Sequence, residues 1–90
     1  MDKELMHQIL LALRDDPYTR QRYIASACHV WLCSEHFLDT MQYMFKCGLI
    51  DCVSVNDPAQ MEYFNLWYLT DDGDRAIMTI ENRKGDNENG

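Results

Sequence analysis

The segment SEHFLDTMQYMFKCGLI, residues 34–50, is the most informative part of the sequence. From Phe37 onward its apolar side chains recur at spacings of three and four residues, which is typical of an amphipathic helix. Ser34 is a suitable N-cap, and Gly48 stands where a residue with left-handed backbone geometry commonly follows a helix. The segment therefore predicts a helix that is capped by Ser34, extends to Cys47 and ends at Gly48.

After Gly48 the pattern changes from helical to extended. Residues 49–55 and 61–70 are rich in β-branched, aromatic and other apolar residues, and the turn-forming segment Asn56–Ala59 separates them. The sequence predicts two strands that are joined by a short loop into a β-hairpin.

A further helix is predicted after the hairpin. Thr70 is a suitable cap, and Gly73 in the first turn is a mild cost to the helix. Acidic residues are favourable at the positive end of a helix dipole, and this first turn contains Asp71, Asp72 and Asp74. Its apolar side consists of Ala76, Ile77 and Ile80. Residues 83–90 are all polar or glycine, so we expect a domain over residues 1–82 and a disordered polar tail over 83–90.

The part of the chain before Ser34 predicts two more elements. Residues 2–16 show an apolar stripe with helical spacing, with Asp2 as N-cap and Pro17 ending the helix. Residues 18–32 fit a helix, which we favour, but His29–Cys33 fits a short strand equally well.

The order helix, helix, helix, hairpin, helix resembles a winged helix, an α+β variant of the helix-turn-helix. Met41–Ile50 looks like the end of a recognition helix with its "GLI" exit, and Leu69–Gly73 looks like the "LT-x-x-G" start of the closing helix. The resemblance covers about residues 2–81 and implies a three-helix core, a two-stranded wing and a C-terminal helix. The sequence is also similar to a family of short, uncharacterised winged-helix proteins of bacteria and phages. That similarity implies a phage or prophage origin and supplies no activity.

Length and composition restrict the classes of function. The chain has 90 residues, of which 47% are apolar and 26% are charged, so we expect one small globular domain without an enclosed cleft. No nucleophile motif, acid/base motif or glycine-rich phosphate loop is recognisable, so we expect no enzymatic activity and no cofactor. No signal peptide and no membrane-spanning run is recognisable, so we expect a cytoplasmic protein that does not bind membranes.

Charge argues against a typical DNA-binding surface. The formal net charge is −7; residues 1–56 carry seven acidic and five basic side chains, and residues 57–90 carry eight and three, which gives −2 and −5. The predicted hairpin contains no Lys or Arg, although phosphate backbones are contacted mainly by basic side chains.

Two sets of candidate site residues correspond to two hypotheses. If the protein contacts nucleic acid, guanidinium and other basic groups would bind phosphate, and the candidates are Arg14, Arg20, Arg22, His36 and Lys46. If it binds a basic protein instead, carboxylates could take the place of phosphates and aromatic residues could anchor the interface. The candidates for that interface are Asp57, Glu62, Tyr63, Trp67, Asp71, Asp72 and Asp74.

The cysteines form two pairs with four intervening residues, Cys28 with Cys33 and Cys47 with Cys52. Structural zinc sites usually have closer pairs on a tight turn, and here apolar residues lie between the cysteines. We favour packing over metal binding and predict no metal site.

Our leading hypothesis from the sequence is a non-enzymatic acidic winged helix that binds a protein partner, as an inhibitor or DNA mimic. That partner would be a basic nucleic-acid-binding protein, and a second hypothesis for the aromatic strand is a homodimer interface. The alternative is a dimeric DNA-binding transcriptional regulator.

Overall fold

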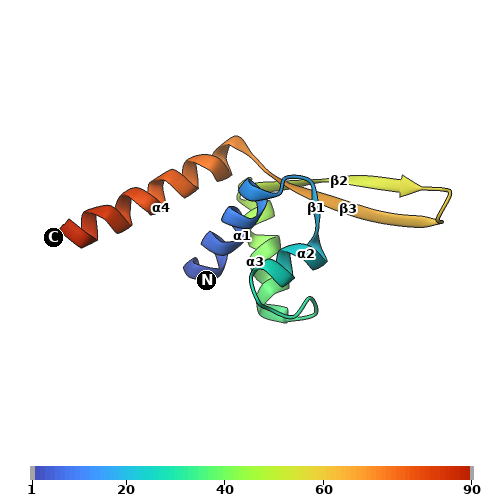
Figure 1. Cartoon of the computed structure of the whole chain (residues 1–90), viewed down its shortest axis with the longest axis horizontal. Helices are drawn as coiled ribbons and strands as arrows, with labels where there is room; N and C mark the ends of the chain where they lie inside the picture. Colours follow the sequence, from blue (N-terminus) through green and yellow to red (C-terminus); the bar gives the residue numbers. More distant parts are fainter. Residues whose placement is uncertain (1, 90) are drawn as a thin grey trace.

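A computed structural model of the chain describes the backbone of residues 2–89 and the side chains of residues 2–82. Within these residues four helices and three strands follow one another, and Figure 1 shows their arrangement. Their bounds are α1 Lys3–Asp15, β1 Thr19–Arg20, α2 Gln21–Ala27, α3 Glu35–Lys46, β2 Ile50–Asp57, β3 Glu62–Leu69 and α4 Asp71–Asn89.

Helix α1 confirms the prediction for residues 2–16. The Asp2 side chain accepts a hydrogen bond of 3.1 Å from the Leu5 amide, so it satisfies one of the free donors of the first turn. The predicted stripe faces the core, and its buried members are Leu5, Ile9, Leu10 and Leu13. The helix ends at Asp15, two residues before Pro17.

The prediction for residues 18–32 is only partly right. The helix α2 is present but ends at Ala27, and His29–Cys33 is not a strand but part of the connection to α3. His29 has a φ of 58°, which ends helical geometry there. The strand in this region is instead β1, which is too short for a periodicity of two to be recognised in the sequence.

Helix α3 confirms the prediction for residues 34–47. The Ser34 side chain accepts from the Phe37 amide at 3.5 Å, and Gly48 has the left-handed φ of 76° that was expected after the helix. The buried side of the helix consists of Phe37, Thr40, Met41 and Met44. Phe37, Met41 and Met44 form a single hydrophobic core with the buried residues of α1 and with Ile24, Ala25, Cys28, Ile50 and Ile77.

The predicted hairpin is present, and it belongs to a three-stranded antiparallel sheet with the order β1-β3-β2. Strands β2 and β3 pair over their whole length, from Ile50 opposite Leu69 to Asp57 opposite Glu62. Strand β2 begins one residue later and ends two residues later than predicted, and Met61 lies in the turn. The third strand, β1, was not predicted, and it pairs with Trp67 and Leu66 of β3.

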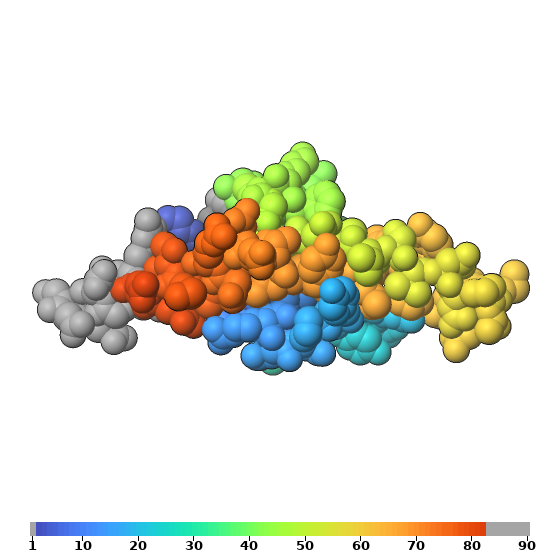
Figure 2. Space-filling model, turned by 90° about the horizontal axis from the view of Figure 1, so that it is seen from above, coloured from blue at the N-terminus to red at the C-terminus, as the bar shows by residue number. Residues whose placement is uncertain are grey.

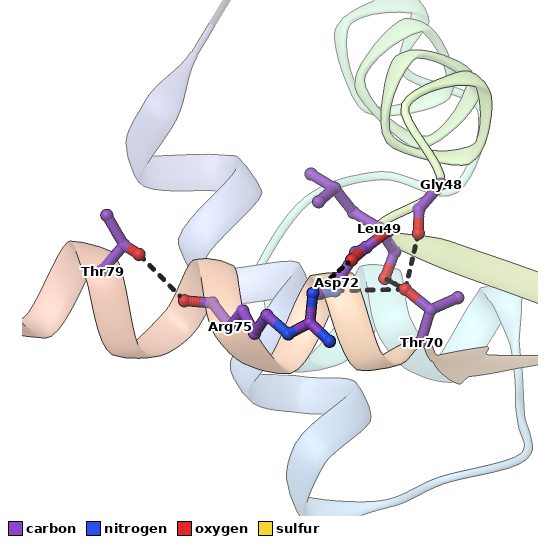
Figure 3. A network of polar contacts seen from close by, with 7 residues as sticks. Gly48, Leu49, Thr70, Asp72, Arg75 and Thr79 are labelled. Carbon is purple, nitrogen blue, oxygen red and sulfur yellow. Dashed lines mark hydrogen bonds and ion pairs between the residues drawn. The ribbon is translucent and has the colours of Figure 1, made fainter.

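The base of the hairpin is closed by contacts between the two predicted motifs (Figure 3). The Thr70 hydroxyl lies 2.5 Å from the Gly48 carbonyl oxygen and 2.9 Å from that of Leu49, and it accepts from the Gly73 amide at 3.1 Å. A Cβ atom at Gly73 would overlap with the Leu49 carbonyl oxygen and would lie 2.7 Å from Cδ1 of Leu69. The glycine is therefore required by a close approach of two backbones.

Figure 1 shows that the hairpin and α4 leave the helical body on opposite sides. Helix α4 packs against α1 through Ile77, which is buried. Helix α4 continues to Asn89, so the backbone of residues 83–89 is helical where a disordered tail was predicted over 83–90. The side chains of residues 83–90 lie outside the described part of the chain. No helix among the described residues is both long enough and apolar enough to span a bilayer.

Candidate functional site

The helix-turn-helix of α2 and α3 presents one side of α3 to solvent. In Figure 2 α3, in green, protrudes from the molecule beside the yellow hairpin. Its exposed side chains are Glu35, His36, Leu38, Asp39, Gln42, Tyr43, Phe45 and Lys46. This surface combines two carboxylates, two groups that can be cationic, one amide and three large side chains.

Two polar side chains of this surface are held by neighbours. His36 Nε2 lies 3.0 Å from Oδ2 of Asp2, and this hydrogen bond is the main reason why the pKa of Asp2 is lowered. A hydrogen bond with Cys47, one turn further along α3, raises the pKa of Tyr43. His36 is thus tied to the first turn of α1 as well as being exposed.

Two of the three arginine candidates for nucleic-acid contact form ion pairs with other parts of the chain. Arg14 contacts Glu81 of α4 at 3.5 Å, and Arg20 contacts Glu62 of β3 at 3.1 Å. The Arg20 guanidinium also lies 3.8 Å from the centre of the Phe64 ring. Two of the three guanidinium groups therefore have their charge balanced within the chain.

Arg22 and Lys46 are exposed basic candidates whose charge is not balanced in this way. Arg22 projects from the start of α2, 5.7 Å from the centre of the Tyr23 ring, and Lys46 ends α3. Among the side chains of residues 2–82 neither has an ion-pair partner. They are the basic groups of the helix-turn-helix that are best able to bind an external anion.

The acidic candidates do not form one surface. Asp57 accepts from the Ala59 amide at 3.1 Å at the tip of the hairpin, where Glu62 binds Arg20. Asp71, Asp72 and Asp74 lie at the other end of β3, and Asp72 contacts Arg75 at 3.3 Å. The eight residues of β3 put roughly 20 Å between the two groups.

The two aromatic candidates differ in exposure. Tyr63 is 73% exposed near the hairpin tip, whereas Trp67 is half-buried and packs against the core. The Trp67 ring meets the Phe45 ring edge-on, with 5.9 Å between centroids. Its Nε1 is buried without a hydrogen-bond partner in the described part of the chain. Trp67 is therefore not an exposed anchor.

A groove with a volume of about 350 Å³ lies between the start of α2, the connection to α3, α3 itself and β3. Its apolar lining consists of Leu32, Leu38, Phe64 and Trp67, and its polar lining consists of Arg20, Gln21, Arg22 and Asn65. No pattern in the sequence indicated this groove. Leu38 was assigned to the apolar side of α3, but it is 40% exposed, because Phe37, Met41 and Met44 already fill the buried side.

The four cysteines are free thiols. Cys28 is buried in the core and its burial raises the pKa of the thiol, while Cys33 and Cys47 are exposed. Within residues 2–82 no group of three or more His, Cys, Asp or Glu side chains is placed to hold a metal ion.

Comparison with known proteins gives matches in structure and not in sequence. No protein-family model matches the chain, and no curated protein matches it. Among solved structures, a MarR family transcription regulator matches 92% of this chain with a TM-score of 0.72 and 18% identity. The PcaV transcriptional regulator from Streptomyces coelicolor matches 90% with a TM-score of 0.71 and 23% identity. The transcriptional repressor CouR, bound to a 23-mer DNA duplex, matches 84% with a TM-score of 0.64 and 22% identity.

The chain has the winged helix-turn-helix fold. It spans about half the length of these neighbours, between 50% and 56% of each. The predicted resemblance to winged helices is confirmed, with α3 in the place of the recognition helix and β2 and β3 as the wing. The similarity to uncharacterised bacterial and phage proteins finds no support, since no family model matches.

Proposed function

We propose that this chain is a non-enzymatic DNA-binding module of a transcriptional regulator, in which α3 enters the major groove of duplex DNA. The fold neighbours support this proposal, because they are transcription regulators and one of them is bound to a DNA duplex. The alternative hypothesis from the sequence is thus better supported than the leading one.

The observation that carries the proposal is the exposed side of α3, which follows the turn of the helix-turn-helix and lies next to the wing. Gln42 and Lys46 are exposed one turn apart on this side. A side-chain amide can form two hydrogen bonds with the major-groove edge of adenine, and an amine can bind guanine or phosphate. Both side chains therefore suit contacts in a major groove.

The charges of the molecule predict weak, mildly salt-dependent binding. Arg14 and Arg20 are already paired, so Arg22 and Lys46 are the main phosphate ligands near α3. Two phosphate contacts correspond to a slope of about −2 in a plot of log K against log salt concentration. Specificity would then depend on base contacts more than on attraction to the backbone.

Fluorescence anisotropy of a labelled duplex tests the proposal. A pool of random-sequence duplexes is first enriched on the protein, and the selected duplex is titrated at low and at near-physiological salt. We expect Lys46→Ala to weaken binding to all sequences and to reduce the salt slope by about 1. Gln42→Ala should weaken binding to the selected duplex by about tenfold and leave binding to unselected DNA unchanged.

Arg75→Ala serves as the matched control, since Arg75 is an exposed base on α4 that already pairs with Asp72. This substitution should leave duplex binding unchanged. The proposal is wrong if no duplex is bound at low salt, or if Lys46→Ala and Arg75→Ala have equal effects.

The hypothesis of an acidic inhibitor or DNA mimic of phage origin is less well supported. A mimic needs carboxylates at the spacing of phosphates along one surface, and the acidic candidates here lie at the two ends of β3. Homodimer formation, which belongs to the regulator hypothesis, stays a prediction. Analytical ultracentrifugation of the whole chain tests it.

A further inference from the structure

The groove beside α3 is lined by apolar side chains and by two guanidinium groups, one of which is paired with Glu62, in an otherwise acidic chain. The charged side chains that line it are Arg20 and Arg22, whereas the net charge of the chain is −7. Leu32 and Leu38 are 46% and 40% exposed there. This groove therefore offers apolar contact together with two guanidinium groups.

Strand β3 adds backbone hydrogen-bonding groups to one border of the groove. β1 pairs only with Leu66 and Trp67 of β3, so residues 62–65 have a strand partner on the β2 side alone among the described residues. Phe64 and Asn65 in this stretch line the groove. An unpaired strand edge is a template for an added extended segment.

Arg20 lies along the same edge. Its guanidinium sits over Phe64 and binds the Glu62 carboxylate at 3.1 Å, with about a third of the Arg20 side chain and 45% of the Glu62 side chain exposed. An incoming carboxylate could take the place of Glu62, because the guanidinium fork accepts any carboxylate in the same geometry. Arg22 is available to a second carboxylate.

We infer that this groove binds an extended peptide segment of a partner protein in which acidic side chains alternate with large apolar ones. The acidic side chains bind Arg20 and Arg22, and the apolar side chains contact Leu32, Leu38 and Phe64. Trp67 lines the groove, and its buried Nε1 has no hydrogen-bond acceptor in the described part of the chain. A rearrangement on binding that gives this donor an acceptor would stabilise the complex. The inference does not rest on the proposed DNA binding.

Nuclear magnetic resonance of the whole 15N-labelled chain tests the inference. The probe is an eight-residue peptide in which Asp alternates with Leu and Phe, and its matched control has Lys in place of Asp. The chain contains two tryptophans, so two indole N–H signals are expected. We expect the acidic peptide to shift the Trp67 indole signal and the amides of Arg22 and Leu38, with a smaller shift for Trp31, which is 83% exposed and does not line the groove.

Two variants that change the net charge by the same amount test whether the position of the charge matters. Arg22→Glu should weaken binding of the acidic peptide by at least about tenfold. Lys3→Glu changes the net charge by the same amount on α1, away from this groove, and should leave binding within about twofold of the unsubstituted chain.

Three outcomes would overturn the inference. The first is a Lys peptide that binds as well as the acidic one, and the second is an acidic peptide that moves none of the named signals at millimolar concentration. The third is a mixed-sequence duplex that shifts these signals while the peptide does not, which would assign the groove to the nucleic-acid interface.

Discussion

The two ends of strand β3 differ in how many contacts with the rest of the chain fix their conformation. At its base, Leu69 is followed by Thr70, whose hydroxyl contacts the carbonyl oxygens of Gly48 and Leu49 and accepts from the Gly73 amide. Gly73 lies so close to the Leu49 carbonyl that there is no room for a side chain. At its tip, Met61 is 92% exposed and has a left-handed φ of 53° that a side chain disfavours. The base is fixed by contacts within the chain, and the tip is shaped mainly by the turn.

This difference between the base and the tip explains why the sequence carries recognisable motifs only at the base. The "GLI" and "LT-x-x-G" patterns describe one contact at the base, where each residue type has a steric or hydrogen-bonding reason. No comparable pattern marks the tip or the groove, because exposed residues there have few partners in the chain. Substitutions at the base should therefore cost stability, and substitutions at the tip should not.

The largest effect is expected for Gly73→Ala. The added methyl group would overlap with the Leu49 carbonyl, so we expect a loss of about 3 kcal/mol in the free energy of unfolding, measured by urea denaturation. Gly48→Ala is the control: Gly48 has a positive φ that Ala disfavours, which Gly73 does not have, but there is open space around Gly48, so this substitution should cost only about 1 kcal/mol. Equal costs for the two substitutions would refute the close approach at the base.

A smaller loss is expected for Thr70→Val. This substitution removes the hydroxyl that caps α4 and binds the end of the "GLI" turn, and it should cost about 1–2 kcal/mol in the same urea experiment. Thr79→Val on the same helix removes an exposed hydroxyl that, among the described side chains, bonds only to the Arg75 carbonyl (Figure 3). A cost for Thr79→Val as large as that for Thr70→Val would show that the hydrogen bonds at the base are not special.

At the tip of the hairpin we expect a substitution to raise the free energy of unfolding instead of lowering it. Met61→Asn should raise the free energy of unfolding by roughly 0.5 kcal/mol, because Asn tolerates left-handed geometry better and Met61 has little burial to lose. Met78→Asn, an exposed site within α4, should instead lower stability slightly, since Asn is a poorer helix former. Thermal denaturation of both variants checks the pair, and a destabilised Met61→Asn would contradict the strain at the tip.

The smallest expected effect concerns the titration of Tyr68. Its hydroxyl donates to Asp51 at 3.1 Å, which raises the pKa of Tyr68, so this pair stabilises the fold at neutral pH and ceases to do so as the pH rises through the raised value. Asp51→Asn should return the pKa of Tyr68 toward the ordinary value of about 10. Asp57→Asn, at the tip end of β2, should leave it unchanged. Nuclear magnetic resonance of the tyrosine ring signals during an alkaline titration measures both.

Most of the fold could be predicted because its elements carry local signals. The caps Asp2, Ser34 and Thr70 all act as expected, and the stripes of α1 and α3 face the core. The strand β1 could not be predicted, because Thr19 and Arg20 are extended only through pairing with Trp67 and Leu66, far along the chain. The helix over residues 18–32 was predicted too long at both ends, because β1 takes up its beginning and the left-handed φ of His29 follows its end at Ala27.

The candidate site was less predictable because a charge in the sequence does not reveal its partner. Arg20 and Glu62 were assigned to opposite hypotheses, and they form an ion pair with each other. Trp67 was expected as an exposed anchor, but Phe45 and the core cover it. The groove combines residues from four elements, so no spacing within one element could indicate it.

The order of the sheet has a consequence for how copies of this chain behave in solution. Strand β2 forms the outer edge, and along its eight residues one row of backbone donors and acceptors has no strand partner in the described part of the chain. Such an edge favours aggregation through the pairing of strands from two molecules, unless charge keeps the molecules apart. Asp51 and Asp57 at the two ends of β2 and the net charge of −7 supply that repulsion at neutral pH. Acidification should therefore cause strand-mediated aggregation before it unfolds the helices.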